Sequence, residues 1–176
     1  MDAIQPLNFA QQKLVIAGTV EFIHRAEDIF KRNFGIIPIL FDLKGRSAGM
    51  YRIKKNGSAI RYNAFIFSKY FEDNLAVTVP HEVAHYITDA VYGLKNIRPH
   101  GKEWKQLMRL FDADPSRTCN YDLSGIPLRT TRRHAYCCAC STHQLTSVRH
   151  NRIRRGSARY YCRKCRQVLT EIDPLQ

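Results

Sequence analysis

The sequence contains no long hydrophobic run and no recognisable export signal. No apolar segment approaches the roughly 20 residues that a helix needs to cross a bilayer. The first residues, Met1 to Pro6, do not place a basic stretch before an apolar one, so they do not resemble a signal peptide. We therefore expect a cytoplasmic protein that has no membrane partner.

Acidic residues are also scarce towards the C-terminus, where none lies between Arg129 and Arg166. The formal net charge is +13, and it is unevenly distributed. Residues 1–128 carry 17 Lys and Arg against 13 Asp and Glu, whereas residues 129–176 carry 11 against 2. Such a basic block favours a polyanionic partner, and we expect DNA or another nucleic acid. A solvated basic tail is the alternative.

The spacing of apolar residues predicts an α+β fold with a small antiparallel sheet. Helical periodicity begins at Phe9, with Ile16, Val20 and Ile23 on the buried stripe. Three strand-like segments follow, and Asn56-Gly57 between the last two is typical of a hairpin turn. The expected helices are 9–33, 64–71, 74–92 and 102–111, and the expected strands are 36–41, 47–53 and 58–62.

Composition divides the chain into two domains and a linker. Residues 1–115 hold the predicted helices and the sheet. Residues 116–134 are irregular and contain proline and glycine, as linkers often do. Residues 135–176 combine cysteine pairs, arginines and tyrosines with strand-like alternation.

The segment His81-Glu82-Val83-Ala84-His85 is an H-E-x-x-H motif. Residues four apart on a helix share one face, so both imidazoles can reach one zinc ion. Glu82 can then act as general base on a water that the metal activates. Apolar neighbours such as Val79 and Ile87 indicate a buried helix, whose polar residues need partners. The reaction that this chemistry supports is amide hydrolysis.

Either His100 or Glu103 can complete the zinc site, because both residue types bind zinc. His100 is favoured, since it lies at the start of a helix and can project back towards the motif. Glu103 can simply complement the dipole of that helix. Asp89 is expected to be a solvated helix residue, with the orientation of a ligand as the alternative.

Five of the six cysteines lie after position 136, in two groups. Without an export signal, metal binding is favoured over disulfides. About twenty residues separate Cys137-Cys138-Ala139-Cys140 from Cys162-Arg163-Lys164-Cys165, which is typical of a structural zinc ribbon with four ligands. The isolated Cys119 is expected to be a plain thiol.

The first cysteine group leaves the choice of ligands open. Cys137 and Cys140 form a regular C-x-x-C, whereas Cys138 and Cys140 form a tighter C-x-C, and His143 can replace one of them. Between the two groups lies a basic segment that would form a hairpin tip and contact phosphates. Its arginines are Arg149, Arg152, Arg154 and Arg155.

These motifs resemble the SprT family of zinc metallopeptidase-like proteins, bacterial relatives of the Spartan DNA-dependent protease. The resemblance covers nearly the whole chain. It rests on Ser47-Ala48-Gly49, on Val79 to His85, on Pro99 to Trp104, and on the tail from Cys140 through His150-Asn151-Arg152 to Cys165.

The resemblance implies a minimal zincin-like metallopeptidase domain followed by a zinc ribbon, in a cytoplasmic protein. It implies zinc at His81, His85 and His100 rather than Glu103, with Glu82 as the catalytic residue. It also implies Cys138 rather than Cys137 as the partner of Cys140, and Cys162 with Cys165 as the second pair. The expected cofactors are one catalytic and one structural zinc ion.

Two functions are compatible with these motifs. The first is a zinc endopeptidase that acts on DNA-associated proteins, because Spartan relatives cleave proteins crosslinked to DNA. The second is a nucleic-acid-binding or regulatory zinc protein with little or no peptidase activity. The intact His-Glu-His set favours the first, because a purely structural zinc site has no need for Glu82.

Overall fold

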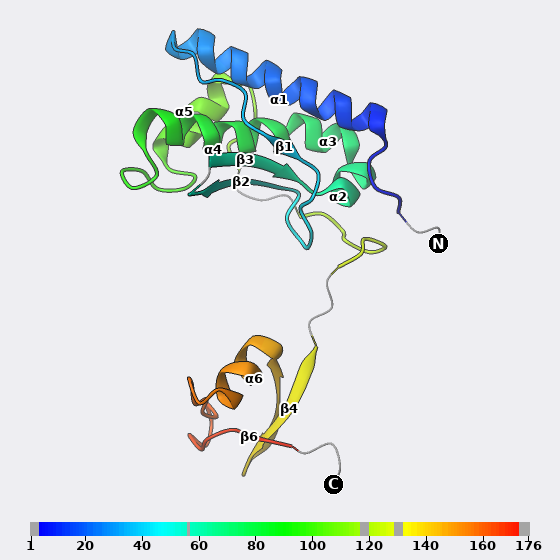
Figure 1. The fold of residues 1–176 in the computed structure, drawn as a ribbon, viewed down its shortest axis with the longest axis vertical. Coiled ribbons are helices and arrows are strands. Elements are labelled where there is room, and N and C mark those ends of the chain that lie inside the picture. The colour runs from blue at the N-terminus through cyan, green and yellow to red at the C-terminus, as the bar shows by residue number, and fades with distance from the viewer. Residues whose placement is uncertain (1–3, 56, 117–119, 129–131, 173–176) are drawn as a thin grey trace. The chain divides into compact units, whose positions relative to one another are not determined.

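The computed structural model describes residues 4–55, 57–116, 120–128 and 132–172. They form a mixed α+β protein with two small sheets, which divides into two compact units, Met1–Leu128 and Arg129–Gln176 (Figure 1). This division lies within the predicted linker, residues 116–134. Across the described ranges, none of the helices has both the length and the hydropathy to cross a bilayer.

The first unit begins with the long helix α1, Phe9–Phe30. Asn8 caps it, because its side chain accepts from Gln11 N at 2.9 Å while the Gln11 side chain accepts from Asn8 N at 3.0 Å. The predicted stripe is wrong at Ile16, which is 38% exposed. Apolar residues occur on several sides of α1, so periodicity alone could not select the buried face. The buried residues are Val15, Thr19, Ile23 and Ala26.

The first sheet has the strand order β1-β3-β2, with β1 at Ile39–Leu40, β2 at Gly49–Lys54 and β3 at Gly57–Tyr62. Strands β2 and β3 pair antiparallel, which confirms the predicted hairpin, although Asn56 lies outside the described residues. The all-antiparallel prediction is wrong at β1, which pairs parallel with β3. A two-residue strand carries no sequence signal for its direction. Because the strand order is β1-β3-β2, strand β2 forms an edge of the sheet.

Helix α4, Thr78–Tyr92, is the central element of the first unit and lies between α1 and the sheet (Figure 1). The predicted helix 74–92 is interrupted at Val77, which separates α4 from α3. Pro80 lies in the first turn of α4, where its missing N–H removes no helical hydrogen bond. The remaining helices are α2 at Ala64–Lys69, α3 at Phe71–Ala76 and α5 at Lys102–Leu110.

The second unit contains a sheet with the order β5-β4-β6, in which β4 pairs antiparallel with both neighbours. Its buried core is small and consists of Tyr136, Leu145, Cys162 and Leu169. The strands are β4 at Arg133–Cys138, β5 at Ser141–Thr146 and β6 at Thr170–Glu171.

The predicted basic hairpin tip is wrong, because the segment forms helix α6, Ser147–Arg154. His150 anchors this helix and is 8% exposed. Its Nδ1 lies 3.1 Å from the hydroxyl of Tyr136, and its ring stacks on that of His134 with centroids 3.7 Å apart. A helix buries this side chain against β4 while its arginines remain exposed.

Candidate functional site

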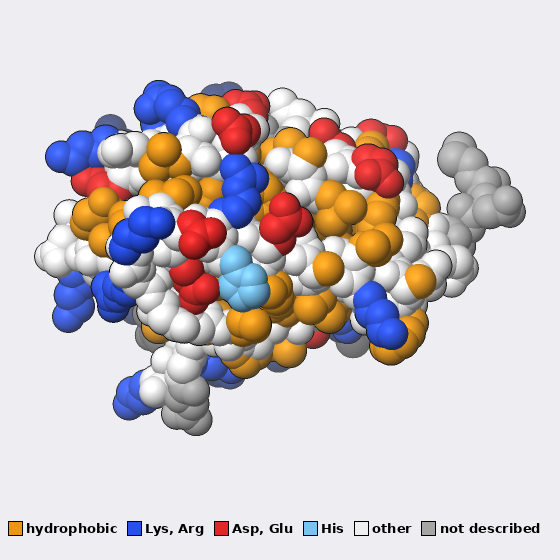
Figure 2. Space-filling model, turned by 90° about the horizontal axis from the view of Figure 1, so that it is seen from above, with side chains coloured by type: hydrophobic (Ala, Val, Ile, Leu, Met, Phe, Trp, Pro, Cys, Tyr) orange, Lys and Arg blue, Asp and Glu red, His pale blue; other side chains and the backbone are white. Residues whose placement is uncertain are grey.

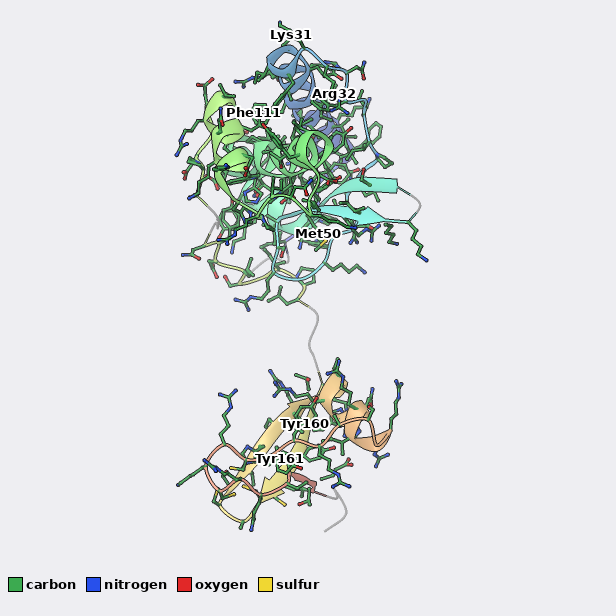
Figure 3. All side chains as sticks on the ribbon, turned by 90° about the vertical axis from the view of Figure 1, so that its left-hand side faces the viewer. Lys31, Arg32, Met50, Phe111, Tyr160 and Tyr161 are labelled. Atoms are coloured by element: carbon green, nitrogen blue, oxygen red, sulfur yellow. The ribbon has the colours of Figure 1, made fainter. Side chains whose placement is uncertain are left out.

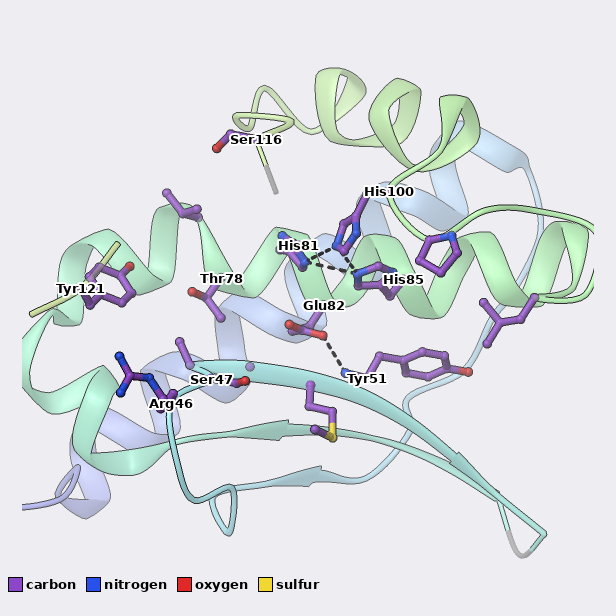
Figure 4. A pocket seen from close by; sticks show the side chains of 16 residues that line it. Arg46, Ser47, Tyr51, Thr78, His81, Glu82, His85, His100, Ser116 and Tyr121 are labelled. Atoms are coloured by element: carbon purple, nitrogen blue, oxygen red, sulfur yellow. Dashed lines mark hydrogen bonds between the residues drawn. The ribbon is translucent and has the colours of Figure 1, made fainter. Parts of the chain in front are cut away.

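Three histidines of the first unit converge on one point, and we call them the histidine cluster (Figure 4). His81 and His85 come from successive turns of α4, and His100 comes from the turn before α5. The Nε2 atoms of His81 and His85 lie 3.2 Å apart. The Nε2 atom of His100 lies 3.0 Å from each of the other two.

The backbone of the turn before α5 directs His100 towards α4. His100 has a φ of 56°, in the left-handed region that few non-glycine residues occupy. The N–H of Gly101 donates to the carbonyl of Arg98 at 2.8 Å. A Cβ on Gly101 would lie 2.8 Å from the same oxygen, so the turn requires glycine at this position.

A shared metal ion explains the spacing of the three Nε2 atoms better than hydrogen bonds among them. A neutral imidazole has one N–H, so three nitrogens in mutual contact cannot all be satisfied by hydrogen bonds among themselves. In a tetrahedral zinc site with Zn–N distances of about 2.0–2.1 Å, the nitrogens lie about 3.3 Å apart. The observed separations are close to this value, and the histidine cluster could hold a metal ion.

Burial favours the neutral form of His81 and His85. Burial, followed by the charge of His100, lowers the pKa of His81 to about 4. Burial, followed by the charges of His81 and His100, lowers the pKa of His85 to about 3. Neutral imidazole is the form that binds metal.

Glu82 lies beside the histidine cluster and is only 5% exposed. Its Oε2 accepts a hydrogen bond from the backbone N–H of Tyr51 on β2 at 2.6 Å. Burial raises the pKa of this carboxyl to about 8, and the Tyr51 hydrogen bond opposes that shift. The carboxyl can therefore hold a proton near neutral pH, and a bound cation would shift its pKa back down.

A cavity of about 510 Å³ lies over the histidine cluster and Glu82. Strand β2 lines it with Gly49, Met50 and Tyr51, while Ser116 and Tyr121 line it from the segment after α5 (Figure 4). The carboxylate and the imidazoles thus face a space large enough for part of a peptide.

Trp104 is a site residue whose role the sequence did not reveal. Its ring lies against all three imidazoles, with centroid distances of 4.7 Å to His81, 5.6 Å to His85 and 4.7 Å to His100. Its Nε1 donates to the carbonyl of His81 at 3.3 Å. Its position four residues after His100 was a possible signal, but a tryptophan is equally expected in an ordinary helix core.

Glu103, the other candidate ligand, does not join the histidine cluster. Its Oε1 lies 3.8 Å from Lys102 Nζ at the start of α5. Asp89 differs from the solvated residue that was predicted, because it accepts from the hydroxyl of Tyr51 at 2.8 Å and from Leu94 N at 3.0 Å. It connects β2 to the loop after α4.

Four cysteines of the second unit also converge, and we call them the cysteine cluster: Cys138, Cys140, Cys162 and Cys165. Their sulfur atoms all lie within 4.8 Å of one another. A tetrahedral zinc ion with Zn–S distances of about 2.3 Å separates its sulfurs by about 3.8 Å. The observed Sγ distances are 3.5 Å between Cys138 and Cys140 and 3.6 Å between Cys140 and Cys162, so the cysteine cluster could also hold a metal ion.

The two alternative ligands take different places. Cys137 lies outside the cysteine cluster, with its Sγ 3.4 Å from the Thr170 hydroxyl, because successive strand residues face opposite sides. His143 Nε2 lies 3.3 Å from Cys138 Sγ. This hydrogen bond lowers the pKa of the Cys138 thiol to about 5, which favours the metal-binding thiolate. Cys119 lies outside the described residues.

The predicted phosphate-contacting arginines lie on or next to α6, and all are exposed. The guanidinium of Arg149 lies over the ring of Tyr160 at 5.4 Å from its centroid. Tyr160 and Tyr161, both labelled in Figure 3, precede Cys162 in the chain, and Tyr161 is 55% exposed. The four arginines are Arg149, Arg152, Arg154 and Arg155.

Comparison with known proteins identifies the family. A model of the SprT-like family matches residues 19–132. Protein SprT of Vibrio parahaemolyticus is 38% identical over 151 residues, which is 85% of this chain and 87% of that protein. Protein SprT of Shewanella oneidensis is 34% identical over 160 residues, which is 90% of this chain and 98% of that protein. No solved structure gives a significant match. This protein therefore belongs to the SprT-like family.

Proposed function

We propose that this protein is a zinc-dependent peptidase whose first unit is a minimal zincin-like domain. The observation that carries the proposal is the position of Glu82, a buried carboxyl beside three converging imidazoles under a cavity of about 510 Å³. A structural metal site needs no such carboxyl. The family assignment supports the proposal as well.

In this proposal, the histidine cluster would hold zinc and Glu82 would move the proton. Zinc with three protein ligands keeps one position open, lowers the pKa of a water to about 7 and polarises a carbonyl. Glu82 takes a proton from the attacking water and delivers it to the leaving amine. The Tyr51 N–H fixes the carboxylate during both transfers. The edge strand β2 offers backbone groups along which an extended peptide can lie.

We also propose that the second unit binds DNA and that the substrates are proteins bound or crosslinked to it. The exposed arginines of α6 suit phosphates, and the exposed ring of Tyr161 suits an unpaired base. The cysteine cluster would hold a structural zinc ion. We propose a cytoplasmic location, in which cysteines serve as metal ligands rather than in disulfides.

The substitution Glu82→Gln tests the peptidase function. It should reduce cleavage of a protein crosslinked to a single-stranded oligonucleotide at least about 1,000-fold, since the general base and its proton transfers are lost. Zinc content, measured by mass spectrometry, should remain at two ions per chain. The matched control Glu103→Gln, outside the histidine cluster, should retain activity.

Two outcomes would contradict this proposal. If Glu82→Gln cleaves at the wild-type rate, the mechanism in which Glu82 transfers the proton is wrong. A wild-type protein that binds DNA with a steep salt dependence, but cleaves neither free nor crosslinked protein, would instead support a nucleic-acid-binding or regulatory zinc protein.

A further inference from the structure

Gly49, at the start of β2, has no room for a side chain beside Glu82. A Cβ on Gly49 would lie 2.6 Å from Cγ and 2.7 Å from Oε1 of Glu82. It would also lie 2.7 Å from Cγ2 of Thr78. Side chains do not approach to such distances, so only glycine fits between β2 and α4 here. The Ser47-Ala48-Gly49 segment has no part in metal binding, and this contact gives its glycine a role.

Glycine is needed at position 49 because β2 and α4 leave no space for a side chain, and not because of its backbone conformation. Gly49 has no positive φ, so an alanine could adopt the same backbone angles. Gly18 on α1 shows the contrast, because the nearest atoms to its Cβ would be 4.0 Å away, on Leu75 and Val79. Replacing a glycine by alanine at an unstrained position usually stabilises a protein slightly. A loss of stability in Gly49→Ala would therefore come from the overlap of the new Cβ with Glu82 and Thr78.

The close approach at Gly49 brings a backbone donor to Glu82. Tyr51 is two residues further along the same edge strand, and its N–H donates to Glu82 Oε2 at 2.6 Å. The hydroxyl of Tyr51 donates to Asp89 on α4 at 2.8 Å. At the other end of the contact, Thr78 donates to Asn74 Oδ1 at 2.7 Å, which fixes its side chain against Gly49. Strand β2 is thus hydrogen-bonded to α4 at Glu82 and Asp89, and its first residue lies close to Thr78.

We propose that Gly49 is a positioning residue for Glu82: its missing side chain lets β2 approach α4 closely enough for the Tyr51 N–H to hold the carboxylate. The effect on catalysis rests on the proposed peptidase function, whereas the contact itself does not. A side chain at position 49 displaces the Glu82 carboxylate from the Tyr51 N–H and from the cavity.

The substitution Gly49→Ala tests the catalytic consequence in the full-length protein. With fluorescein-labelled casein and a single-stranded oligonucleotide as probes, kcat should fall about 10- to 100-fold, because displacements of about 1 Å have effects of this size. KM should change less than about threefold, and the zinc content should stay at two ions per chain. Gly18→Ala should leave kcat and zinc content unchanged. An unchanged kcat in Gly49→Ala would overturn the proposal.

A stability cycle tests the contact without any activity measurement. Gly49→Ala should lower the unfolding midpoint by about 3–8 °C. In the Gly49→Ala background, Glu82→Ala and Thr78→Ser should each recover part of this loss, because each removes an atom that the new Cβ meets. Additive effects would overturn the proposal. If the stability effects are coupled but the wild-type protein cleaves no probe, the contact of Gly49 with Glu82 and Thr78 is supported and the peptidase function is rejected.

Discussion

The histidine cluster and the cysteine cluster differ in the number of donors and in what surrounds them. The histidine cluster supplies three nitrogens, next to a buried carboxyl and a cavity of about 510 Å³. The cysteine cluster supplies four sulfurs. Three ligands leave a tetrahedral zinc ion one open position, whereas four ligands close it. The same ion can therefore be expected to do chemistry in the first unit and to stabilise structure in the second.

The two units also differ in hydrophobic core and in charge. The histidine cluster is attached to a core that α1, α4, α5 and β3 build together. Among the described residues, the buried core of the second unit consists of Tyr136, Leu145 and Leu169 together with Cys162, which is itself a member of the cysteine cluster. The face of the first unit in Figure 2 carries basic and acidic side chains side by side. The second unit carries most of the excess positive charge, so catalysis and polyanion binding are expected in separate units.

The largest expected effect comes from removing one ligand of each cluster. Cys162→Ser should release one zinc ion and unfold the second unit, because a structural zinc ion contributes about 10–16 kcal/mol to the folding of small domains. His81→Ala should release the other zinc ion and abolish cleavage, yet leave the first unit folded on its larger core. Zinc analysis and amide NMR spectra of the full chain would separate the two results.

Cys137→Ser is the matched control for the cysteine cluster. Its sulfur lies beside Thr170 and outside the cluster, so both zinc ions should remain. If Cys137→Ser releases zinc while Cys138→Ser does not, the ligand set is Cys137 with Cys140 instead. If His81→Ala unfolds the first unit, both metals are structural and the contrast between the clusters disappears.

A smaller effect is expected from Trp104→Phe, which tests whether the core holds the histidine cluster in place. The substitution removes the N–H bond to the His81 carbonyl and part of the surface against three imidazoles. We expect a loss of about 1–2 kcal/mol in unfolding free energy and about 10-fold weaker zinc binding, as for other residues that support metal ligands. Competition with a chromogenic chelator would measure the affinity.

Phe111→Leu provides the comparison for Trp104. Phe111 follows α5 about two helical turns after Trp104, is 2% exposed and packs against Phe22. Its substitution should destabilise the first unit by a similar amount while zinc affinity stays unchanged. Equal losses of zinc affinity in both variants would show that general core stability, and not contact with the imidazoles, supports the metal site.

The sequence predicted the site more completely than the sheet. His81 and His85 share a helix face by spacing alone, and the cysteine pairs converge as their separation suggested. The direction of β1 was wrong because two residues cannot encode it. The contacts of Gly49 and Trp104 depend on how β2 and α5 meet α4, and periodicity carries no information about such distances. The helix α6 was missed because the arginines obscured its one buried residue, His150.

The smallest structural effect is expected from the double substitution Arg149→Gln with Arg152→Gln. It is also the sharpest test of the difference in charge between the two units. Both side chains are exposed on α6, so unfolding free energy should change by less than about 0.5 kcal/mol per site. Affinity for a single-stranded oligonucleotide should fall, and the slope of log affinity against log salt should decrease by about 0.7 per arginine. Arg109→Gln, an exposed cation of α5 in the first unit, should leave the slope unchanged. If the slope responds equally to Arg109→Gln, the polyanion contacts the first unit as well, and the separation of catalysis from DNA binding between the units is wrong.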